Sequence, residues 1–327
     1  MKAVQMTGVG GPEVLSVADV AIPEPGDGQV LIKVSATSVN RADITQRQGN
    51  YPPPKGDSEI LGLEIAGVVE KLGAGVEGCH PGERVMSLVG GGGYAEYAVA
   101  YASHLIRMPD RLSFDQAACV AETYITAHLN IFNVGRLTDG EVVLLHGGGG
   151  GVNTAGIQLC KQLVPASRVL VTASPGKLER VAALGADLVI DYQNEEFDEA
   201  VRNDTDQHGA DVILDHIGSA YLTANLKALA VSGRLVVIGV MSGAEAKINL
   251  ARLMVKRQRV IGSVLRARPV DEKAAITARF VDEVLPLFAS GTIEPLIHAV
   301  LPLEDVAEAH RTMEASAHFG KIVLSLV

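Results

Sequence analysis

The sequence predicts an α/β protein in which a β-rich, barrel-like domain carries an inserted domain built on a doubly wound parallel sheet. Two patterns lead to this fold class. The first 120 residues contain short strand-like runs broken by glycine and proline clusters, whereas the following part alternates buried apolar runs with helical stretches. The length of 327 residues agrees, because a single core stops growing beyond about 250–300 residues.

The β-rich part is recognised by strand-like runs at 30–34, 67–71 and 84–88, and by alternating aromatic and small residues at 94–100. Clusters of glycine and proline, such as the one at 25–28, separate these runs. Because glycine and proline favour turns, the pattern is typical of short strands in a compact, barrel-like domain.

The pattern changes near Phe114. We predict a helix over 115–133, followed by a continuous apolar run at 142–146 and a helix that ends near Leu163. Further buried strands are expected at 168–172, 186–191, 211–215 and 234–239. Helical stretches separate these runs, and such alternation is typical of βαβ units with a parallel sheet that is buried on both faces.

The chain after Pro269 is too short for a third domain. It is expected to form helices at 271–289 and 304–315 and strands at 297–302 and 321–327. These elements most simply complete the β-rich domain, which makes the α/β part an insertion. The predicted domains are therefore 1–122 together with 266–327, and 123–265.

Composition and charge argue against several classes of protein. The chain is 47% hydrophobic and 20% charged, as expected for a globular protein, and its formal net charge is −10. Such an acidic chain lacks the basic surface that attracts nucleic acids and anionic lipids. We find no apolar run typical of a signal peptide or membrane span and no CxxC pair, so we expect a cytoplasmic protein with reduced thiols.

The segment 147–151 is a run of five glycines between the first buried strand of the α/β part and its helix. Glycine allows backbone N–H groups to approach a pyrophosphate, and the helix N-terminus adds a partial positive charge. The run could also be a flexible linker, but its position between strand and helix favours a dinucleotide site. The expected contacts come from Gly148, Gly149, Gly150, Gly151 and Val152.

The end of the second strand bears on the choice of cofactor. An NAD site usually places an acidic residue there, about 20 residues beyond the glycine loop, to bind the ribose 2′-OH. No acidic residue precedes Glu179, whereas Ser174 and Lys177 follow the strand directly. A hydroxyl and an ammonium suit a 2′-phosphate, so NADP(H) is favoured. The alternative is that Ser174 caps the helix and Lys177 is only solvated.

Several segments occur together in one known family. They are 38–43, 48–54, 61–64, the glycine loop, Lys177, Tyr192 and 320–324. With the inserted βαβ domain, they make essentially the whole chain resemble the medium-chain dehydrogenase/reductase superfamily. Within it, the sequence is most similar to the zinc-independent, zeta-crystallin-like NADPH:quinone oxidoreductases, and more narrowly to their tumour-suppressor-induced branch.

This resemblance implies a GroES-like β-barrel catalytic domain, an inserted Rossmann domain and a homodimer formed through an edge strand. It also implies transfer of a hydride from NADPH to small-molecule quinones or activated alkenes. By family position, the adenosine 2′-phosphate would be held by Ser174, Lys177 and Tyr192. The nicotinamide and substrate would contact Asn40, Tyr51, Thr126, Ile238, Gly239, Met241, Ser263 and Leu265, and Lys321 would contact the cofactor.

Asn40 and Tyr51 are the best candidates for donating hydrogen bonds to the oxygen on which negative charge develops. Each has a structural alternative: Asn40 as a turn residue that bonds the backbone, and Tyr51 as a scaffold residue before the rigid turn 52–54. Thr126 could equally be a buried hydroxyl that bonds its own helix. Asp43 is expected to be a helix cap or an ion-pair partner.

Zinc is not expected. Zinc alcohol dehydrogenases of the superfamily carry a ligand histidine where this chain has Leu63, and their first ligand cysteine is missing from 40–43. An alkyl side chain cannot bind a metal, and a catalytic zinc needs three protein ligands. Asn153 is a second departure, since the family usually has glycine there. The alternative function that stays open is an NADPH-binding protein with a structural or RNA-binding role and little turnover.

Overall fold

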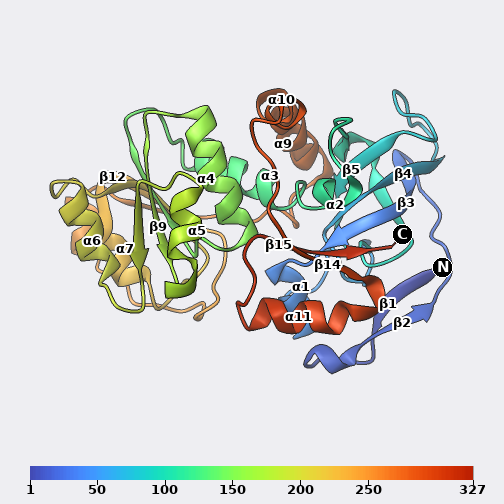
Figure 1. The fold of residues 1–327 in the computed structure, drawn as a ribbon, viewed down its shortest axis with the longest axis horizontal. Helices are drawn as coiled ribbons and strands as arrows, with labels where there is room; N and C mark the ends of the chain where they lie inside the picture. The colour runs from blue at the N-terminus through green and yellow to red at the C-terminus, as the bar shows by residue number, and fades with distance from the viewer. Residues whose placement is uncertain (327) are drawn as a thin grey trace. The chain divides into compact units, whose positions relative to one another are not determined.

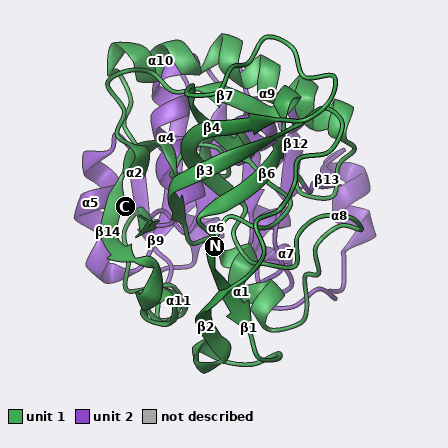
Figure 2. Ribbon diagram, turned by 90° about the vertical axis from the view of Figure 1, so that its right-hand side faces the viewer, with its two compact units in different colours: residues 1–125, 265–327 green, residues 126–264 purple. Residues whose placement is uncertain are grey.

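The computed structural model describes residues 1–326 of the chain. The chain separates into two compact units, which Figure 2 shows in different colours. Residues 1–125 and the described chain from 265 onward form the first unit, and residues 126–264 form the second. The second unit is therefore one continuous segment inserted into the sequence of the first.

Within residues 1–326, the first unit is built on a seven-stranded sheet. Its order is β14 (Ile297–Pro302), β15 (Lys321–Ser325), β3 (Gln29–Ser38), β4 (Glu64–Leu72), β5 (Arg84–Leu88) and β7 (Leu105–Arg107), with β6 (Tyr97–Tyr101) paired to β3. A separate hairpin joins β1 (Lys2–Met6) to β2 (Leu15–Asp19). The C-terminal strand β15 thus lies beside the N-terminal strand β3, antiparallel to it.

Strand β3 illustrates why this sheet forms. Val30, Ile32 and Val34 alternate along it and are buried in one cluster with Ile65 and Val69 of β4. Side chains at positions i and i+2 point to the same face of a strand, so the alternation creates one apolar row. β-branched residues pack well on such a pleated surface. The β-rich character expected for the first 120 residues is confirmed.

The second unit, all of which is described, has a six-stranded parallel sheet. Its order is β10 (Leu188–Asp191), β9 (Arg168–Ala173), β8 (Val142–His146), β11 (Ala210–Asp215), β12 (Leu229–Val237) and β13 (Arg259–Gly262). Strand order reverses between β8 and β11. The carboxyl ends of strands at such a reversal are where ligands bind in open α/β sheets.

Helices cover both faces of this sheet. They are α4 (Gly151–Leu163), α5 (Leu178–Ala183), α6 (Phe197–Asp204), α7 (Leu222–Ala228) and α8 (Leu250–Val255). Figure 1 shows α4 and α5 beside one face, and α6 and α7 beside the other. Coverage on both sides explains why β8 reads as a continuous apolar run in which every residue is buried. The predicted doubly wound parallel sheet is confirmed.

The single helix predicted over 115–133 is wrong. The structure has α2 (Phe114–Ala117), α3 (Thr123–His128) and a π-helical turn, η3 (Leu129–Val134). Between α2 and α3, the backbone N–H of Glu122 donates to the carboxylate of Glu64, 2.8 Å away, instead of to a helical carbonyl. A long-range hydrogen bond of this kind leaves no trace in local periodicity.

The helix predicted over 271–289 is divided into α9 (Val270–Glu283) and α10 (Leu285–Ser290). The break precedes Pro286, which has no backbone N–H and disfavours helical geometry at the residue before it. The later helix is confirmed as α11 (Val306–Glu314), and so is the strand β14. Among the described residues, no helix is both long and apolar enough to span a bilayer.

Candidate active site

The glycine loop connects β8 to α4, as predicted. The backbone N–H groups of Gly147 and Gly148 donate to the carbonyl oxygen of Thr172 on β9, which anchors the start of the loop. A Cβ on Gly148 would lie 2.4 Å from the side chain of Val171. Glycine is therefore required for the loop to approach the sheet this closely, and its following N–H groups lead into the N-terminus of α4.

The predicted phosphate-binding residues lie beside this loop. Lys177 packs against Gly149, where a Cβ would lie 2.5 Å from the lysine Cδ. Ser174 precedes the short helix η4 (Pro175–Lys177), and its hydroxyl makes no capping hydrogen bond, contrary to the capping alternative. Strands β9 and β10 end in register, so Ser174 and the exposed Tyr192 leave the sheet side by side. Ser174 and Tyr192 therefore follow neighbouring strand ends, and Lys177 lies against the glycine loop.

Asn153 ties the loop to its helix. This buried side chain donates through Nδ2 to the carbonyl oxygens of His146 and Gly147, the latter at 3.1 Å. Its Oδ1 is buried without a hydrogen-bond partner in the described chain. A glycine has no side chain to make these contacts. Asn153 therefore links the N-terminal turn of α4 to the end of β8 by side-chain hydrogen bonds.

The residues predicted to cover the nicotinamide follow the carboxyl ends of β12 and β13. Ile238 donates its N–H to the backbone carbonyl oxygen of Asp215, and Met241 is exposed two residues after Gly239. Ser263 donates its N–H to the carbonyl of Val237, the last residue of β12, and its buried hydroxyl has no partner in the described chain. These segments therefore lie at neighbouring strand ends, on the same sheet as the glycine loop.

Thr126 and Leu265 stand apart from that group. The Thr126 hydroxyl is buried and makes no hydrogen bond within residues 1–326, so it does not bond its own helix as the structural alternative required. Leu265 belongs to the first unit, where it lines a small cavity described below.

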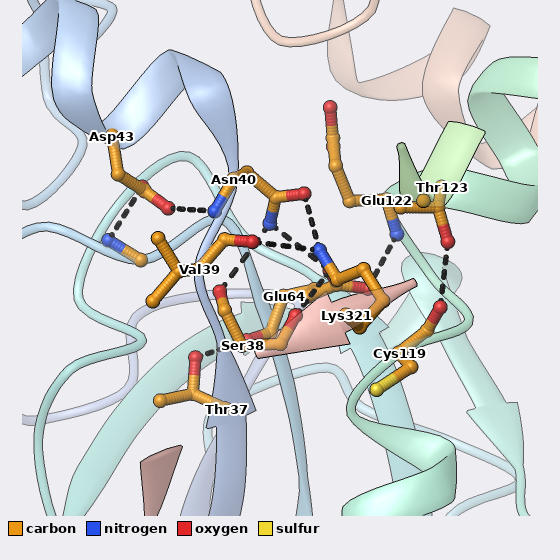
Figure 3. A network of polar contacts seen from close by, with 12 residues as sticks. Thr37, Ser38, Val39, Asn40, Asp43, Glu64, Cys119, Glu122, Thr123 and Lys321 are labelled. Atoms are coloured by element: carbon orange, nitrogen blue, oxygen red, sulfur yellow. Dashed lines mark hydrogen bonds and ion pairs between the residues drawn. The ribbon is translucent and has the colours of Figure 1, made fainter. Parts of the chain in front are cut away.

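A buried polar network in the first unit holds Asn40 and Lys321 (Figure 3). Lys321 Nζ donates to the carbonyl oxygen of Val39 at 2.9 Å and to Asn40 Oδ1 at 2.6 Å, and forms an ion pair with Glu64 at 3.0 Å. The Asn40 amide nitrogen donates to the same carboxylate at 3.0 Å. Glu64 also accepts from Ser38 Oγ and from the N–H of the segment between α2 and α3.

This network engages both ends of the Asn40 amide and all three donors of Lys321. Both side chains are buried. The structure therefore places them as residues that hold β3, β4 and β15 in register at one end of the sheet, with their polar groups directed at one another. A contact of Lys321 with a cofactor would require one of these bonds to break.

Asp43 has the predicted capping role. It lies in the first turn of α1 (Arg41–Arg47), and its carboxylate accepts from the N–H of Asn40 at 2.8 Å, from Gly62 N–H and from Tyr94 Oη. Burial raises the pKa of this carboxyl to about 6, although the three hydrogen bonds lower it. Gly62 has a φ of +101°, which suits glycine, and it thereby directs its N–H at the carboxylate.

Tyr51 is held by an arginine. The guanidinium carbon of Arg266 lies 5.2 Å from the centre of the Tyr51 ring, and the guanidinium donates to the Tyr51 carbonyl, to Gly90 and to Gln46. Burial raises the pKa of the tyrosine hydroxyl, so it is protonated near neutral pH. Within the described chain this hydroxyl has no hydrogen-bond partner. Ring and backbone are thus fixed while the donor is free to bind a ligand.

Arg266 also lines a small cavity in the first unit. The other lining residues are Leu63, Leu88, Val89, His104, Glu122, Leu265 and Lys273. Sequence reasoning missed Glu122, although a single carboxylate inside the apolar stretch 117–127 is a detectable signal. Leu63 contributes only an alkyl group, and residues 1–326 contain no group of three or more histidine, cysteine, aspartate or glutamate side chains suited to a metal ion.

A parallel sheet with a glycine loop at its strand-order reversal, in a chain that also folds a β-rich unit, is typical of dinucleotide-dependent oxidoreductases. Two family models match: "Alcohol dehydrogenase GroES-like domain" over residues 26–110 and "Zinc-binding dehydrogenase" over residues 184–324. The human protein named quinone oxidoreductase is 32% identical over 330 residues, covering 100% of this chain and 98% of that one.

Solved structures agree with this similarity. The quinone oxidoreductase of Pseudomonas syringae has a TM-score of 0.90 at 31% identity and covers 99% of each chain. That of Escherichia coli, solved with NADPH, has a TM-score of 0.90 at 27% identity, covering 99% of this chain and 100% of that one. The chain belongs to the quinone oxidoreductases of the medium-chain dehydrogenase/reductase superfamily.

Proposed function

We propose that this protein uses NADPH to reduce quinones or activated alkenes such as enones, and that it does so without a metal. The observation that carries the proposal is the pairing of two features. Lys177 lies against the glycine loop that follows β8, and no acidic residue stands between the end of β9 and Glu179. Tyr51 presents a free hydroxyl in the first unit of the described chain. The first feature fits a dinucleotide phosphate and the second fits a reducible oxygen.

The glycine loop passes a test of fit for the cofactor. A Cβ on Gly148 would collide with Val171 and one on Gly149 with Lys177, so only glycine lets the loop pass this closely to them before it enters the N-terminus of α4. The Lys177 ammonium and the Ser174 hydroxyl, beside Tyr192, supply donors for a 2′-phosphate. When bound, NADPH supplies the hydride, and the task of the chain is to bind and orient it.

The acceptor side requires hydrogen-bond donors for a developing oxyanion. Tyr51 provides one, because Arg266 holds its ring while its hydroxyl stays free. The positive charge of Arg266 beneath the ring also favours negative charge nearby. In this proposal Asn40 acts by orienting its neighbours, since both ends of its amide are already bonded.

A homodimer through β13 completes the proposal. This strand is the edge of the six-stranded sheet, so one row of its backbone N–H and C=O groups has no strand partner within the described chain. Exposed apolar side chains gather on and near it, at Leu250, Met254, Val255, Val260 and Val264. A second copy would pair with this edge and cover these side chains.

The test measures the consumption of NADPH, by its absorbance, in the presence of ortho-naphthoquinone or a simple enone. The rate is compared before and after exhaustive chelation of metals. We expect turnover with at least one acceptor and no loss on chelation. Stoichiometric NADPH binding without turnover on any acceptor would contradict the enzymatic proposal. Loss of activity on chelation, restored by zinc, would contradict the metal-free mechanism.

A further inference from the structure

The side chain of Glu122 lies where the chain leaves α2 and enters α3. The backbone N–H of Glu122 donates to Glu64 Oε2 at 2.8 Å, and this hydrogen bond fixes the position of Glu122. Figure 3 shows the Glu122 side chain extending away from Lys321 and from the rest of the polar network. The same contact that interrupts the helix therefore directs a carboxyl group away from the ion pair beside it.

The Glu122 carboxyl reaches the small cavity that Arg266 and Leu63 also line. Across residues 1–326 the structure gives this carboxyl no hydrogen-bond partner, although every other carboxylate of the network is fully bonded. Arg266 connects the cavity to the proposed substrate residue, because its guanidinium also packs against the ring of Tyr51. One arginine therefore lines the cavity together with Glu122 and also contacts the ring of Tyr51.

Charged and titratable groups surround this carboxyl from several elements. Those nearby are Glu64 on β4, Asp43 on α1, Lys321 on β15, Arg266, and His104 and Lys273 in the cavity wall. Burial and the negative charge of Glu64 raise the pKa of Glu122 to about 8, although Lys321 and Arg266 lower it.

The two other polar groups of the cavity wall are bonded to backbone carbonyls. His104 faces the carbonyl oxygen of Val270 at 2.9 Å through Nε2, and burial lowers the pKa of this histidine. Lys273 donates to the backbone carbonyl of Arg266 at 3.3 Å. Burial thus favours the protonated carboxyl of Glu122, and neither His104 nor Lys273 forms an ion pair with it within residues 1–326.

We propose that Glu122 donates the proton that completes the reduction of the acceptor, a role that rests on the proposed function. In this scheme Tyr51 stabilises the negative oxygen by a hydrogen bond, and Glu122 supplies the proton. Such a division is reasonable because the phenol of Tyr51 is a much weaker acid than a carboxyl whose pKa is near the working pH.

The step balances as follows. The acceptor receives two electrons and one hydrogen nucleus from NADPH, which becomes NADP⁺. The O–H bond of Glu122 then breaks, and a new C–H bond forms on a reduced enone or a new O–H bond on a reduced quinone. The carboxylate left on Glu122 regains a proton from water before the next turnover.

The first test compares the pH dependence of kcat for an enone in the wild type and in Glu122→Gln. We expect the wild-type rate to fall above about pH 8. The variant should be about a hundredfold slower at pH 7 and nearly independent of pH, because an amide cannot release a proton. Glu70→Gln, an exposed residue of β4, is the matched control and should keep the wild-type profile.

A second measurement reads the protonation of Glu122 without any substrate. The folded protein holds a proton on this carboxyl between pH 4.5 and about 8, whereas the unfolded chain loses it near 4.5. Glu122 therefore lowers stability progressively as pH rises through that window. Urea unfolding should show Glu122→Gln gaining stability relative to wild type from pH 5 to pH 8, and the Glu70→Gln control should show no such trend.

The outcomes separate the two proposals. A wild type that reduces no acceptor refutes the proposed function, and the role of Glu122 falls with it. A wild type that reduces the enone, together with a Glu122→Gln variant that keeps its rate and pH profile, refutes the role of Glu122 alone. A stability difference that does not change with pH also contradicts it, since the carboxyl would then be ionised in the folded state.

Discussion

The hydrogen bonds of two side chains, Tyr51 and Asn40, distinguish the two donors that the sequence predicted for the acceptor oxygen. The Tyr51 hydroxyl is free within the described chain and its ring is held by Arg266, whereas the amide of Asn40 is bonded to Glu64 and Lys321. A donor that already has partners must exchange them to stabilise a transition state, which reduces its benefit. At the scale of the residue, the catalytic hydrogen bond is therefore expected from Tyr51.

Tyr51→Phe tests this expectation. Loss of one oxyanion donor can cost about 10²–10³ in rate, but water can partly replace a donor in an open site, so we expect about a tenfold fall in kcat for an enone. The fall should be smaller for a quinone, whose reduced oxygen is more stable. The measurements are kcat for both substrates and the Tm of each protein. Equal effects on both substrates, with a lower Tm, would indicate a scaffold role.

Lys177 should determine the choice between NADPH and NADH. We expect the wild type to bind NADPH at least about tenfold more tightly, a difference of about 1.4 kcal/mol, because one charge-assisted contact to a phosphate supplies that much. Lys177→Ala should remove most of the preference. Dissociation constants for both cofactors, measured by fluorescence titration, test this. Arg180→Ala in α5 is the control for a general loss of positive charge. Equal dissociation constants for NADPH and NADH in the wild type would contradict the predicted preference.

At the scale of secondary structure, one ion pair organises several elements. Lys321 on β15 forms an ion pair with Glu64 on β4 and donates to the carbonyl oxygen of Val39, next to the end of β3. Glu64 in turn accepts from the backbone N–H of Glu122, in the segment that separates α2 from α3. Both charged groups are buried, so each depends on the other to offset its loss of hydration. This contact sets the ends of three strands and the position of Glu122.

Lys321→Met should therefore destabilise the fold strongly. Removing one partner of a buried ion pair leaves the other charge uncompensated and typically costs about 3–5 kcal/mol. The free energy of unfolding, from urea titration, is the quantity to measure. Lys33→Met on β3 is the matched control, because Lys33 is exposed and the same change there should cost little. A similar stability for the two variants would mean that the buried pair contributes no more than a solvated lysine.

At the scale of the whole molecule, the open edge of the second unit's sheet is the main feature that a single chain leaves unsatisfied. β13 has a strand partner on one side only within residues 1–326, and it carries the exposed Val260 at 41% accessibility. Exposed edges promote pairing between chains unless they are blocked. The edge and its apolar neighbours together favour a second copy as the partner.

We expect twice the chain mass by sedimentation at micromolar concentration. Val260→Glu should shift the protein toward monomer, since it places charge on the edge that would be paired. Ile22→Glu, at an exposed apolar residue of the first unit, is the control and should leave the mass unchanged. A monomeric wild type at this concentration would contradict the proposal.

Local patterns in the sequence were sufficient for much of the fold. The apolar run of β8, the glycines that follow it and the helix α4 could all be predicted because each depends on neighbours in the chain. The substitution of a metal ligand by Leu63 was equally visible. The helix over 115–133 was predicted wrongly because a hydrogen bond to Glu64, 58 residues away, interrupts it.

The amino-acid sequence by itself determined the parallel sheet, the glycine loop beside Lys177 and the family to which the chain belongs. Only the tertiary structure decided which polar groups are occupied and which are free. It joined Asn40 to Lys321 across 281 positions of sequence, held Tyr51 against Arg266, and left the Glu122 carboxyl in a cavity without a partner. Periodicity reports local geometry, whereas these contacts form only when distant strands close on one another, and the burial that follows sets the charge state of each group.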